Sequence, residues 1–124
     1  MIELVGDAID EAFLNAVKGI QVKVGAKKEI KIVFTPLHGT SGYLGSKLLT
    51  DLGYDYVAVK EQMVPDGDFS TVKSPNPENA SAFELAIKYA KEAHADLVIK
   101  IIILSQTANL LIAWMNLLIL MPIT

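Results

Sequence analysis

The stretch IKIVFTPLHGTSGYLGSKLLTDLGY, Ile30 to Tyr54, decides the fold. Its first six residues, IKIVFT, are β-branched or aromatic apart from one lysine, which is the composition of a short strand buried on both faces. A loop with three glycines follows, and LGSKLLTDLGY then has the apolar spacing of a helix. A strand, a loop and a helix in this order are the building unit of a parallel sheet covered by helices.

Elements of the same two kinds continue on both sides of this stretch. Two further strands are predicted, YVAVK from Tyr56 and ADLVI at residues 95–99. Upstream, residues 7–18 are predicted to form an amphipathic helix that ends near Gly19. Its apolar face consists of Ile9, Phe13, Leu14 and Val17.

A last helix is predicted to begin after a polar loop. Asn76 suits the cap, Pro77 the first helical position, and Glu78 the acid-favouring first turn. The residues on its apolar face are Phe83, Leu85, Ala86, Tyr89 and Ala90. The alternation of strands and helices predicts an α/β fold, a three-layer α/β/α arrangement with a mainly parallel sheet, in a single domain.

Length and charge limit the possible functions. The 124 residues suffice for one domain with a core, and the net charge of -3 gives no basic face for nucleic acid. The chain has no cysteine, which excludes disulfides and thiolate metal sites. The start, MIELVGDAIDEAF, is acidic and amphipathic and lacks the pattern of a secretory signal. We therefore expect a cytoplasmic protein that does not bind nucleic acid.

The charges are distributed unevenly. All 11 basic and 14 acidic residues lie between Glu3 and Lys100, so that residues 101–124 carry no charge. The sequence thus predicts two parts, a globular domain over residues 1–100 and an uncharged apolar tail over residues 101–124.

The loop after the first strand has the strongest local signal for a site, because ligands of parallel sheets bind at the carboxyl ends of strands. Its glycines at 39, 42 and 45 match neither the dinucleotide fingerprint nor a Walker loop. They can bring backbone N–H groups to an anion, or they can simply allow a tight turn and close packing. His38 is open to the same choice, as a base or phosphate ligand or as a turn-stabilising residue. Taken alone, the local residues favour the structural interpretation for both.

Acidic residues in the next loop permit a similar choice. Asp66 and Asp68, in PDGDF, resemble paired oxygen ligands for a hard cation. A Pro-Asp-Gly turn accounts for them with fewer assumptions, and we expect the turn.

Three segments in order, TPLHGTSG at 35–42, EQMVPDGDFSTVKSPNPE at 61–78 and ADLVI at 95–99, together resemble one family. It is the α-D-phosphohexomutase family of phosphoglucomutases and phosphomannomutases, and specifically its second domain. The likeness covers roughly residues 1–99, and within the family it is greatest to bacterial phosphoglucomutase-like enzymes.

The resemblance implies a four-domain, magnesium-dependent enzyme that moves a phosphoryl group between C6 and C1 of a hexose phosphate. The phosphoserine of such enzymes lies on the first domain, and this chain has no counterpart of it. The resemblance also suggests that one loop lies near the phosphate in the active-site cleft. This loop comprises His38, Gly39, Thr40, Ser41 and Gly42.

The family's metal loop, Asp-x-Asp-x-Asp-Arg, directly follows the strand that corresponds to ADLVI. Here the sequence reads KIIILSQTANLL, which supplies no carboxylate. Phosphoryl transfer needs a cation to neutralise oxygen charge, so we expect no catalytic residue, no bound magnesium and no mutase activity in this chain alone.

Three interpretations of the tail remain open. One is a frameshift, because regrouping the codons for ILSQTA permits Pro-Glu-Ser-Asp-Arg. Another is a transmembrane helix over residues 101–123. The third, which we favour, is a soluble fold in which the tail packs on the sheet as a strand or as a helix. The apolar face of that helix would consist of Leu110, Leu111, Trp114, Leu117 and Leu118. An uncovered tail would promote self-association.

The alternative to a mutase fragment is a binding function. In this alternative the chain is a non-catalytic phosphate- or nucleotide-binding α/β module, and Glu61 takes the place of the ribose-binding acid of dinucleotide folds.

Overall fold

The computed structural model describes residues 5–21, 29–74, 79–101 and 119–122. A four-stranded sheet in the order β2-β1-β3-β4 forms its centre. The strands are β1 (Lys31–Thr35), β2 (Asp55–Ala58), β3 (Leu97–Lys100) and β4 (Ile119–Pro122). β1 pairs in parallel with both β2 and β3, whereas β4 is antiparallel to β3. The predicted mainly parallel sheet is therefore confirmed.

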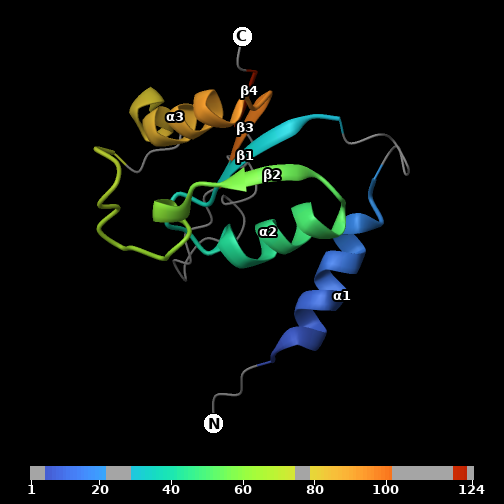
Figure 1. The fold of residues 1–124 in the computed structure, drawn as a ribbon. Coiled ribbons are helices and arrows are strands. Elements are labelled where there is room, and N and C mark those ends of the chain that lie inside the picture. The colour runs from blue at the N-terminus through green and yellow to red at the C-terminus, as the bar shows by residue number, and fades with distance from the viewer. Residues whose placement is uncertain (1–4, 22–28, 75–78, 102–118, 123–124) are drawn as a thin grey trace.

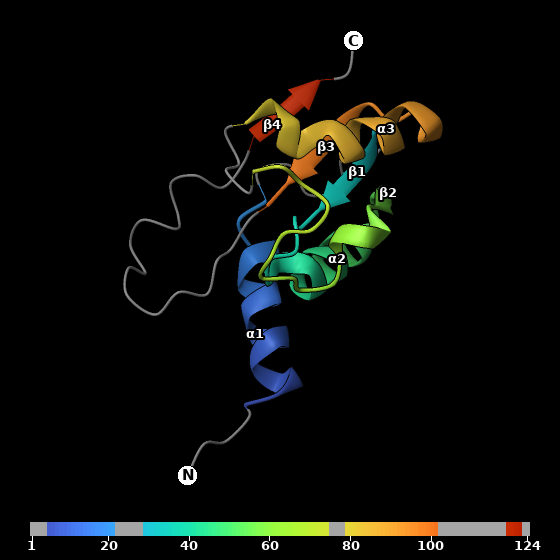
Figure 2. The ribbon, with the colours of Figure 1, turned by 90° about the vertical axis from the view of Figure 1, so that its left-hand side faces the viewer.

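Helices cover both faces of this sheet (Figures 1 and 2). α2 (Ser41–Asp51) lies on one face together with α1 (Asp7–Lys18), which packs on α2, and α3 (Glu84–Ala93) lies on the other. Two short 3-10 helices lie between β2 and α3. η1 (Lys60–Gln62) follows β2, and η2 (Ala80–Phe83) directly precedes α3. The three-layer α/β/α arrangement is thus confirmed.

The core follows from the composition of β1. Ile32, Val33 and Phe34 are at most 2% exposed, so the central strand buries side chains on both faces as its sequence predicts. On the α3 side, a cluster of small and β-branched residues fills the interface. Its members are Val33, Val59, Phe83, Ala86, Ala90, Ala95 and Val98.

A close contact between α2 and β1 forms the core of the opposite face. A Cβ built on Gly45 would lie 2.6 Å from Cζ of Phe34, whose ring is fully buried. The third glycine of the loop motif therefore allows the helix to approach the strand, as the packing interpretation predicts. α2 also begins at Ser41, three residues before the predicted LGSKLL segment, so the intervening loop is short.

The predicted start of the last helix is wrong. Asn79 has extended backbone angles (φ -76°, ψ 128°), and the helical run begins only at Ala80. The Asn79 carbonyl accepts the first helical bond, from Ala82 N–H at 3.0 Å, and its side-chain amide donates to Ser74 Oγ at 2.9 Å. Asn79 thus precedes the 3-10 helix η2 without a side-chain cap bond, and α3 itself follows from Glu84. Residues 76–78 themselves lie outside the described part of the chain.

Of the predicted apolar face of α1, Leu14 is buried but Ile9 is 56% exposed and Phe13 50% exposed. The periodicity correctly predicts the helix, yet Ile9 and Phe13 of its apolar face remain about half exposed.

Part of the tail is described. Residues 119–122 form β4 beside β3, as the interpretation of the tail as an added strand expects. The residues that would form a tail helix lie outside the described ranges. Within those ranges, no helix is long and apolar enough to span a bilayer.

The contact between Gly45 and Phe34 predicts the effect of one added methyl group. Gly45→Ala gains roughly 1 kcal/mol of helix propensity but must displace a buried ring, so we expect a net loss of about 1 to 2 kcal/mol in the free energy of unfolding. Urea denaturation measures it. Gly67→Ala, where an added Cβ meets nothing within 4 Å, is the control and stays near wild type. An unchanged or higher stability of Gly45→Ala would contradict the proposed tight packing.

Candidate functional site

The carboxyl ends of β1, β2 and β3 lie at one edge of the sheet, because the three strands are parallel and end at Thr35, Ala58 and Lys100. This is the edge at which the sequence places a site. The loop after β1 contains the His38 turn, defined as residues 36–40 between β1 and α2. The loop after β2 contains η1 and continues to residue 74, so the predicted residues do come together here.

The His38 turn has an uncommon backbone. Leu37 (φ 48°) and His38 (φ 63°) are both in the left-handed region, which costs a non-glycine residue free energy. Two hydrogen bonds hold this conformation. Leu37 N–H donates to Thr35 Oγ1 at 3.0 Å, and His38 N–H donates to the Gln62 carbonyl at 2.9 Å. The turn is therefore stabilised from β1 and from η1 together.

The His38 ring is enclosed by the loop that follows η1. Its Nδ1 lies 2.9 Å from the Val64 carbonyl oxygen and its Nε2 lies 2.8 Å from Thr71 Oγ1. A carbonyl only accepts, so we assign the proton of the neutral ring to Nδ1, and Nε2 then accepts from the Thr71 hydroxyl. The Phe69 ring packs edge-on against the imidazole, at 6.2 Å between centroids. With 6% of its surface exposed and both nitrogens engaged, His38 acts as a turn-stabilising residue.

These contacts belong to one directed chain of hydrogen bonds. The Thr35 hydroxyl donates to Gln62 Oε1 at 2.7 Å, and Gln62 Nε2 donates to Thr71 Oγ1 at 2.9 Å. The Thr71 hydroxyl then donates to His38, which donates to Val64. Every donor has an acceptor and the direction never reverses. The chain, which we call the Gln62 relay, consists of Thr35, Gln62, Thr71, His38 and Val64.

Packing explains Gly42, in the first turn of α2. A Cβ on Gly42 would lie 3.2 Å from the Met63 carbonyl oxygen, so a side chain here would push the loop after β2 away. Both Gly42 and Gly45 thus support the structural interpretation of the glycine spacing.

Ser41 connects the turn to the residue that follows β3. Its hydroxyl donates to the Ile101 carbonyl at 2.8 Å, and Ile101 N–H donates to the Thr35 carbonyl at 3.0 Å. Both bonds fix the backbone at the place where, by the resemblance, a metal loop begins.

Only one residue of the predicted phosphate-proximal loop is exposed. His38, Gly39, Ser41 and Gly42 are buried, and Thr40 is exposed at the start of α2. The N–H groups of a first helical turn favour anions, so an anion near this loop would meet Thr40 and the backbone first. Proximity of the loop to a phosphate stays a prediction.

The acids of the second loop form a turn. The Asp66 carboxylate accepts hydrogen bonds from Asp68 N–H (3.0 Å) and Ser70 N–H (2.9 Å). The bonds from Ser70, followed by that from Asp68, lower the pKa of Asp66 to about 2. Among the described residues, no three acids or histidines are grouped as a metal site requires.

Glu61 also has a partner within the protein. Tyr89 of α3 donates its hydroxyl to the Glu61 carboxylate at 2.7 Å. This bond lowers the pKa of Glu61 and raises the pKa of Tyr89. The acid that the nucleotide-binding alternative requires is thus oriented toward α3.

Lys100, which the sequence does not mark as unusual, lies at the carboxyl end of β3 with 3% of its surface exposed. Its Nζ is 3.7 Å from the centroid of the Phe83 ring, a cation–π contact. Burial lowers the pKa of this amine to about 8. A buried cation therefore stands directly before the position of the expected metal loop.

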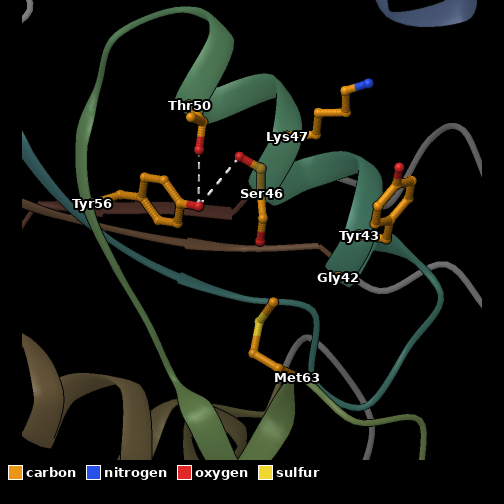
Figure 3. Close-up of a pocket in the computed structure, with 7 residues that line it drawn as sticks. All are labelled: Gly42, Tyr43, Ser46, Lys47, Thr50, Tyr56 and Met63. Atoms are coloured by element: carbon orange, nitrogen blue, oxygen red, sulfur yellow. Dashed lines mark hydrogen bonds between the residues drawn. The ribbon is translucent and has the colours of Figure 1, made fainter. Parts of the chain in front are cut away.

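An open hollow of about 450 Å³ lies beside the turn, between α2 and β2 (Figure 3). Within it, the Tyr56 hydroxyl contacts Thr50 Oγ1 at 3.2 Å and donates to the Ser46 carbonyl at 3.3 Å. The Ser46 hydroxyl is buried and has no hydrogen-bond partner among the residues that the structure describes. The walls of the hollow are mainly apolar. The remaining lining residues are Gly42, Tyr43, Lys47 and Met63.

Sequence reasoning missed Gln62 and Thr71, although Gln62 is fully buried at the centre of the relay. The only signal was an uncharged polar residue four positions after the end of β2. Its partners are 27 residues upstream and 9 downstream, a distance at which no local pattern operates.

The Gln62 relay predicts a specific loss of stability. Gln62→Leu keeps the volume but leaves the buried Thr35 hydroxyl without its acceptor, so we expect about 1 to 3 kcal/mol lower free energy of unfolding by urea denaturation. Gln21→Leu is the matched control, because Gln21 makes only a partly buried bond to the Lys18 carbonyl at 3.2 Å. Equal effects of the two substitutions would contradict the relay's role.

The low pKa of Asp66 predicts a pH dependence. Its folded pKa of about 2 lies below the ordinary value of 3.8, so its contribution is present above about pH 4 and is lost as the pH falls toward 2. In urea titrations over this range, Asp66→Asn should show a smaller decline of stability than wild type. Asp68→Asn also removes one negative charge, but the Asp68 carboxylate accepts neither of these two hydrogen bonds. The stability of this variant should therefore decline with pH as that of wild type does. Identical declines in wild type and Asp66→Asn would refute the assignment.

Comparisons with known proteins agree with the fold. A family model described as "Phosphoglucomutase/phosphomannomutase, alpha/beta/alpha domain II" matches residues 11–101. The phosphoglucomutase of Staphylococcus aureus (strain USA300) is 42% identical over 85 residues, which are 66% of this chain and 15% of that protein. The phosphomannomutase of Mycoplasmoides pirum is 39% identical over 83 residues, with the same two shares. No solved structure matches the chain.

The chain thus spans only about 15% of the length of these relatives. The match includes β1, the His38 turn, the loop after β2 and β3, and so confirms the resemblance that those segments indicate. The chain belongs to the phosphoglucomutase/phosphomannomutase family and corresponds to the family's α/β/α domain II.

Proposed function

We propose that this chain is the domain II portion of an enzyme that interconverts hexose 1-phosphate and hexose 6-phosphate, and that it has no mutase activity by itself. The family match over residues 11–101 carries the first part. The second part rests on the chain's share of its relatives, about 15%, and on the missing carboxylates after β3.

In such an enzyme this domain contributes a scaffold. Ser41 and Thr35 hold the backbone that leaves β3, through bonds to the carbonyl and the N–H of Ile101. A loop that begins there starts at the carboxyl edge of the sheet, at a residue that is bonded to Ser41 and Thr35. Hexose phosphate would then approach this edge, with Thr40 and the first turn of α2 as the nearest exposed groups.

Magnesium does not fit the residues present here. β3 ends at Lys100, a cationic residue that supplies no oxygen ligand to a metal ion. The segment that follows has neutral residues where carboxylates are needed. We derive no catalytic step through a metal in this chain, and we treat residues 101–124 as a replacement of the metal loop. The frameshift interpretation accounts for this replacement.

We also propose a cytoplasmic location, with which the absence of cysteine is compatible. The non-catalytic binding module is the weaker candidate, because Glu61 is bound to Tyr89 and because Gly42 and Gly45 of α2 are needed for packing.

A domain exchange tests the proposal. Residues 11–100 of this chain replace the matching segment of the Staphylococcus aureus phosphoglucomutase, whose own following loop is kept. We expect measurable conversion of glucose 1-phosphate to glucose 6-phosphate in a coupled assay. A second chimaera that also carries residues 101–112 of this chain should be inactive, because it lacks the metal-binding carboxylates.

The control is the far-ultraviolet circular dichroism and thermal unfolding of both chimaeras, which must show folded protein. A folded first chimaera without activity would contradict the proposal. Saturable binding of NAD by the unmodified chain would instead support the nucleotide-binding module.

A further inference from the structure

α1 extends away from the sheet, and among the described elements its main contact is with α2 (Figures 1 and 2). Of the 12 residues of this helix, Leu14 alone is buried. Because burial of apolar surface is the main force that holds a helix to its domain, α1 is anchored by one side chain. Whatever else holds the helix must be polar.

Two ion pairs connect α1 to α2. Lys18 Nζ lies 2.9 Å from the Asp51 carboxylate, and Lys47 Nζ lies 3.8 Å from the Glu11 carboxylate. The four side chains are 28% to 66% exposed, so water and dissolved ions reach both pairs. Ion pairs in such positions contribute little to stability, and salt weakens them further.

The space between the two helices is also incompletely filled. A cavity of about 300 Å³ lies between them, whereas on its other side α2 packs directly on β1 through Gly45 and Phe34. Atoms that face a cavity lack the dispersion attraction of close neighbours, so this joint is weaker than the packing of α2 on the sheet. The cavity is lined by Glu11, Leu14, Asn15, Lys18, Lys47 and Asp51.

α1 has little support of its own. Its N-cap is Gly6, which has no side chain to accept a hydrogen bond from the first N–H groups of the helix. A helix of 12 residues is marginally stable in water when it stands alone. The helical state of α1 therefore depends on its contact with α2.

Lys47 connects this joint to the hollow between α2 and β2, because it lines both spaces. Figure 3 shows its side chain extending away from Tyr56, which lines the same hollow. With α1 in place, the Glu11 carboxylate lies beside the Lys47 amine. Removal of α1 takes away this counter-charge, so the position of the helix changes the charge of one wall of the hollow.

We propose that α1 is a detachable strap, which leaves α2 and unfolds as a separate unit while the sheet and α3 stay folded, and that ionic strength sets the balance between its docked and undocked states. This proposal rests on the contacts of α1 and does not depend on the proposed function.

Hydrogen exchange of the full chain, followed by mass spectrometry, tests the strap directly. Relative to unfolded peptides, the amides of α1 should exchange at least about tenfold faster than those of α3, because a local opening suffices to expose them. Raising sodium chloride from about 0.05 M to about 0.5 M should speed exchange in α1 about two- to fivefold, because salt screens the two ion pairs. The amides of α3 in the same sample are the control and should not respond.

A charge substitution tests the role of the ion pairs. Asp51→Asn removes the partner of Lys18 and should speed exchange in α1 about two- to fivefold at low salt, with a smaller further response to added salt. Asp55→Asn is the matched control. It also removes one negative charge from an ion pair, but that pair joins Asp55 to Lys31 at 3.8 Å, away from α1, so the exchange of α1 should equal that of wild type.

Removal of the apolar anchor tests whether α1 opens separately. Leu14→Ala should speed exchange in α1 at least about tenfold, because it removes the buried side chain of the joint. The amides of α3 should keep their wild-type protection, which also shows that the variant is folded.

Two results would overturn the proposal. Equal protection of α1 and α3 in wild type, or an equal loss of protection in Leu14→Ala, would mean that α1 opens with the whole domain. Exchange in α1 that responds neither to salt nor to Asp51→Asn would mean that ionic strength does not set its docking.

Discussion

The fully buried side chain of Gln62 connects the main parts of the carboxyl edge of the sheet. It accepts a hydrogen bond from Thr35 of β1 and donates one to Thr71 of the following loop, while its backbone carbonyl accepts from His38 N–H. A buried polar group that lost these partners would be costly, so their positions are fixed relative to one another. The left-handed backbone of the His38 turn, the orientation of the imidazole and the path of residues 63–71 all depend on this arrangement.

Much of the fold could be predicted from the sequence, because local patterns specify it. The composition of IKIVFT predicted a strand buried on both faces, and the spacing over residues 7–18 predicted α1 with its observed ends. The start of α3 could not be predicted in this way, because Asn76 has the sequence of a cap whereas the structure places the 3-10 helix η2 first and begins α3 only at Glu84. The exposure of Ile9 and Phe13 was also unpredictable, because periodicity identifies an apolar face but not what covers it.

The candidate site shows the same division. Local glycine spacing correctly indicated close packing, which the contacts of Gly42 and Gly45 explain. The partners of His38 are 26 and 33 residues away in sequence, so only the folded chain could reveal them. The family resemblance supplied what local patterns could not, the identity of the domain. It also made the uncharged segment after Lys100 informative, because the resemblance leads one to expect carboxylates there.

The central claim is that His38 is a structural residue of the Gln62 relay. The most direct test is the tautomer of its ring, measured by two-dimensional nitrogen-15 NMR of the full chain at a pH at which the imidazole is neutral. The relay predicts a protonated Nδ1, which donates to the Val64 carbonyl, and an unprotonated Nε2, which accepts from Thr71. A ring protonated at Nε2, or one that exchanges rapidly between tautomers, would contradict the account and would reopen a role for His38 in binding.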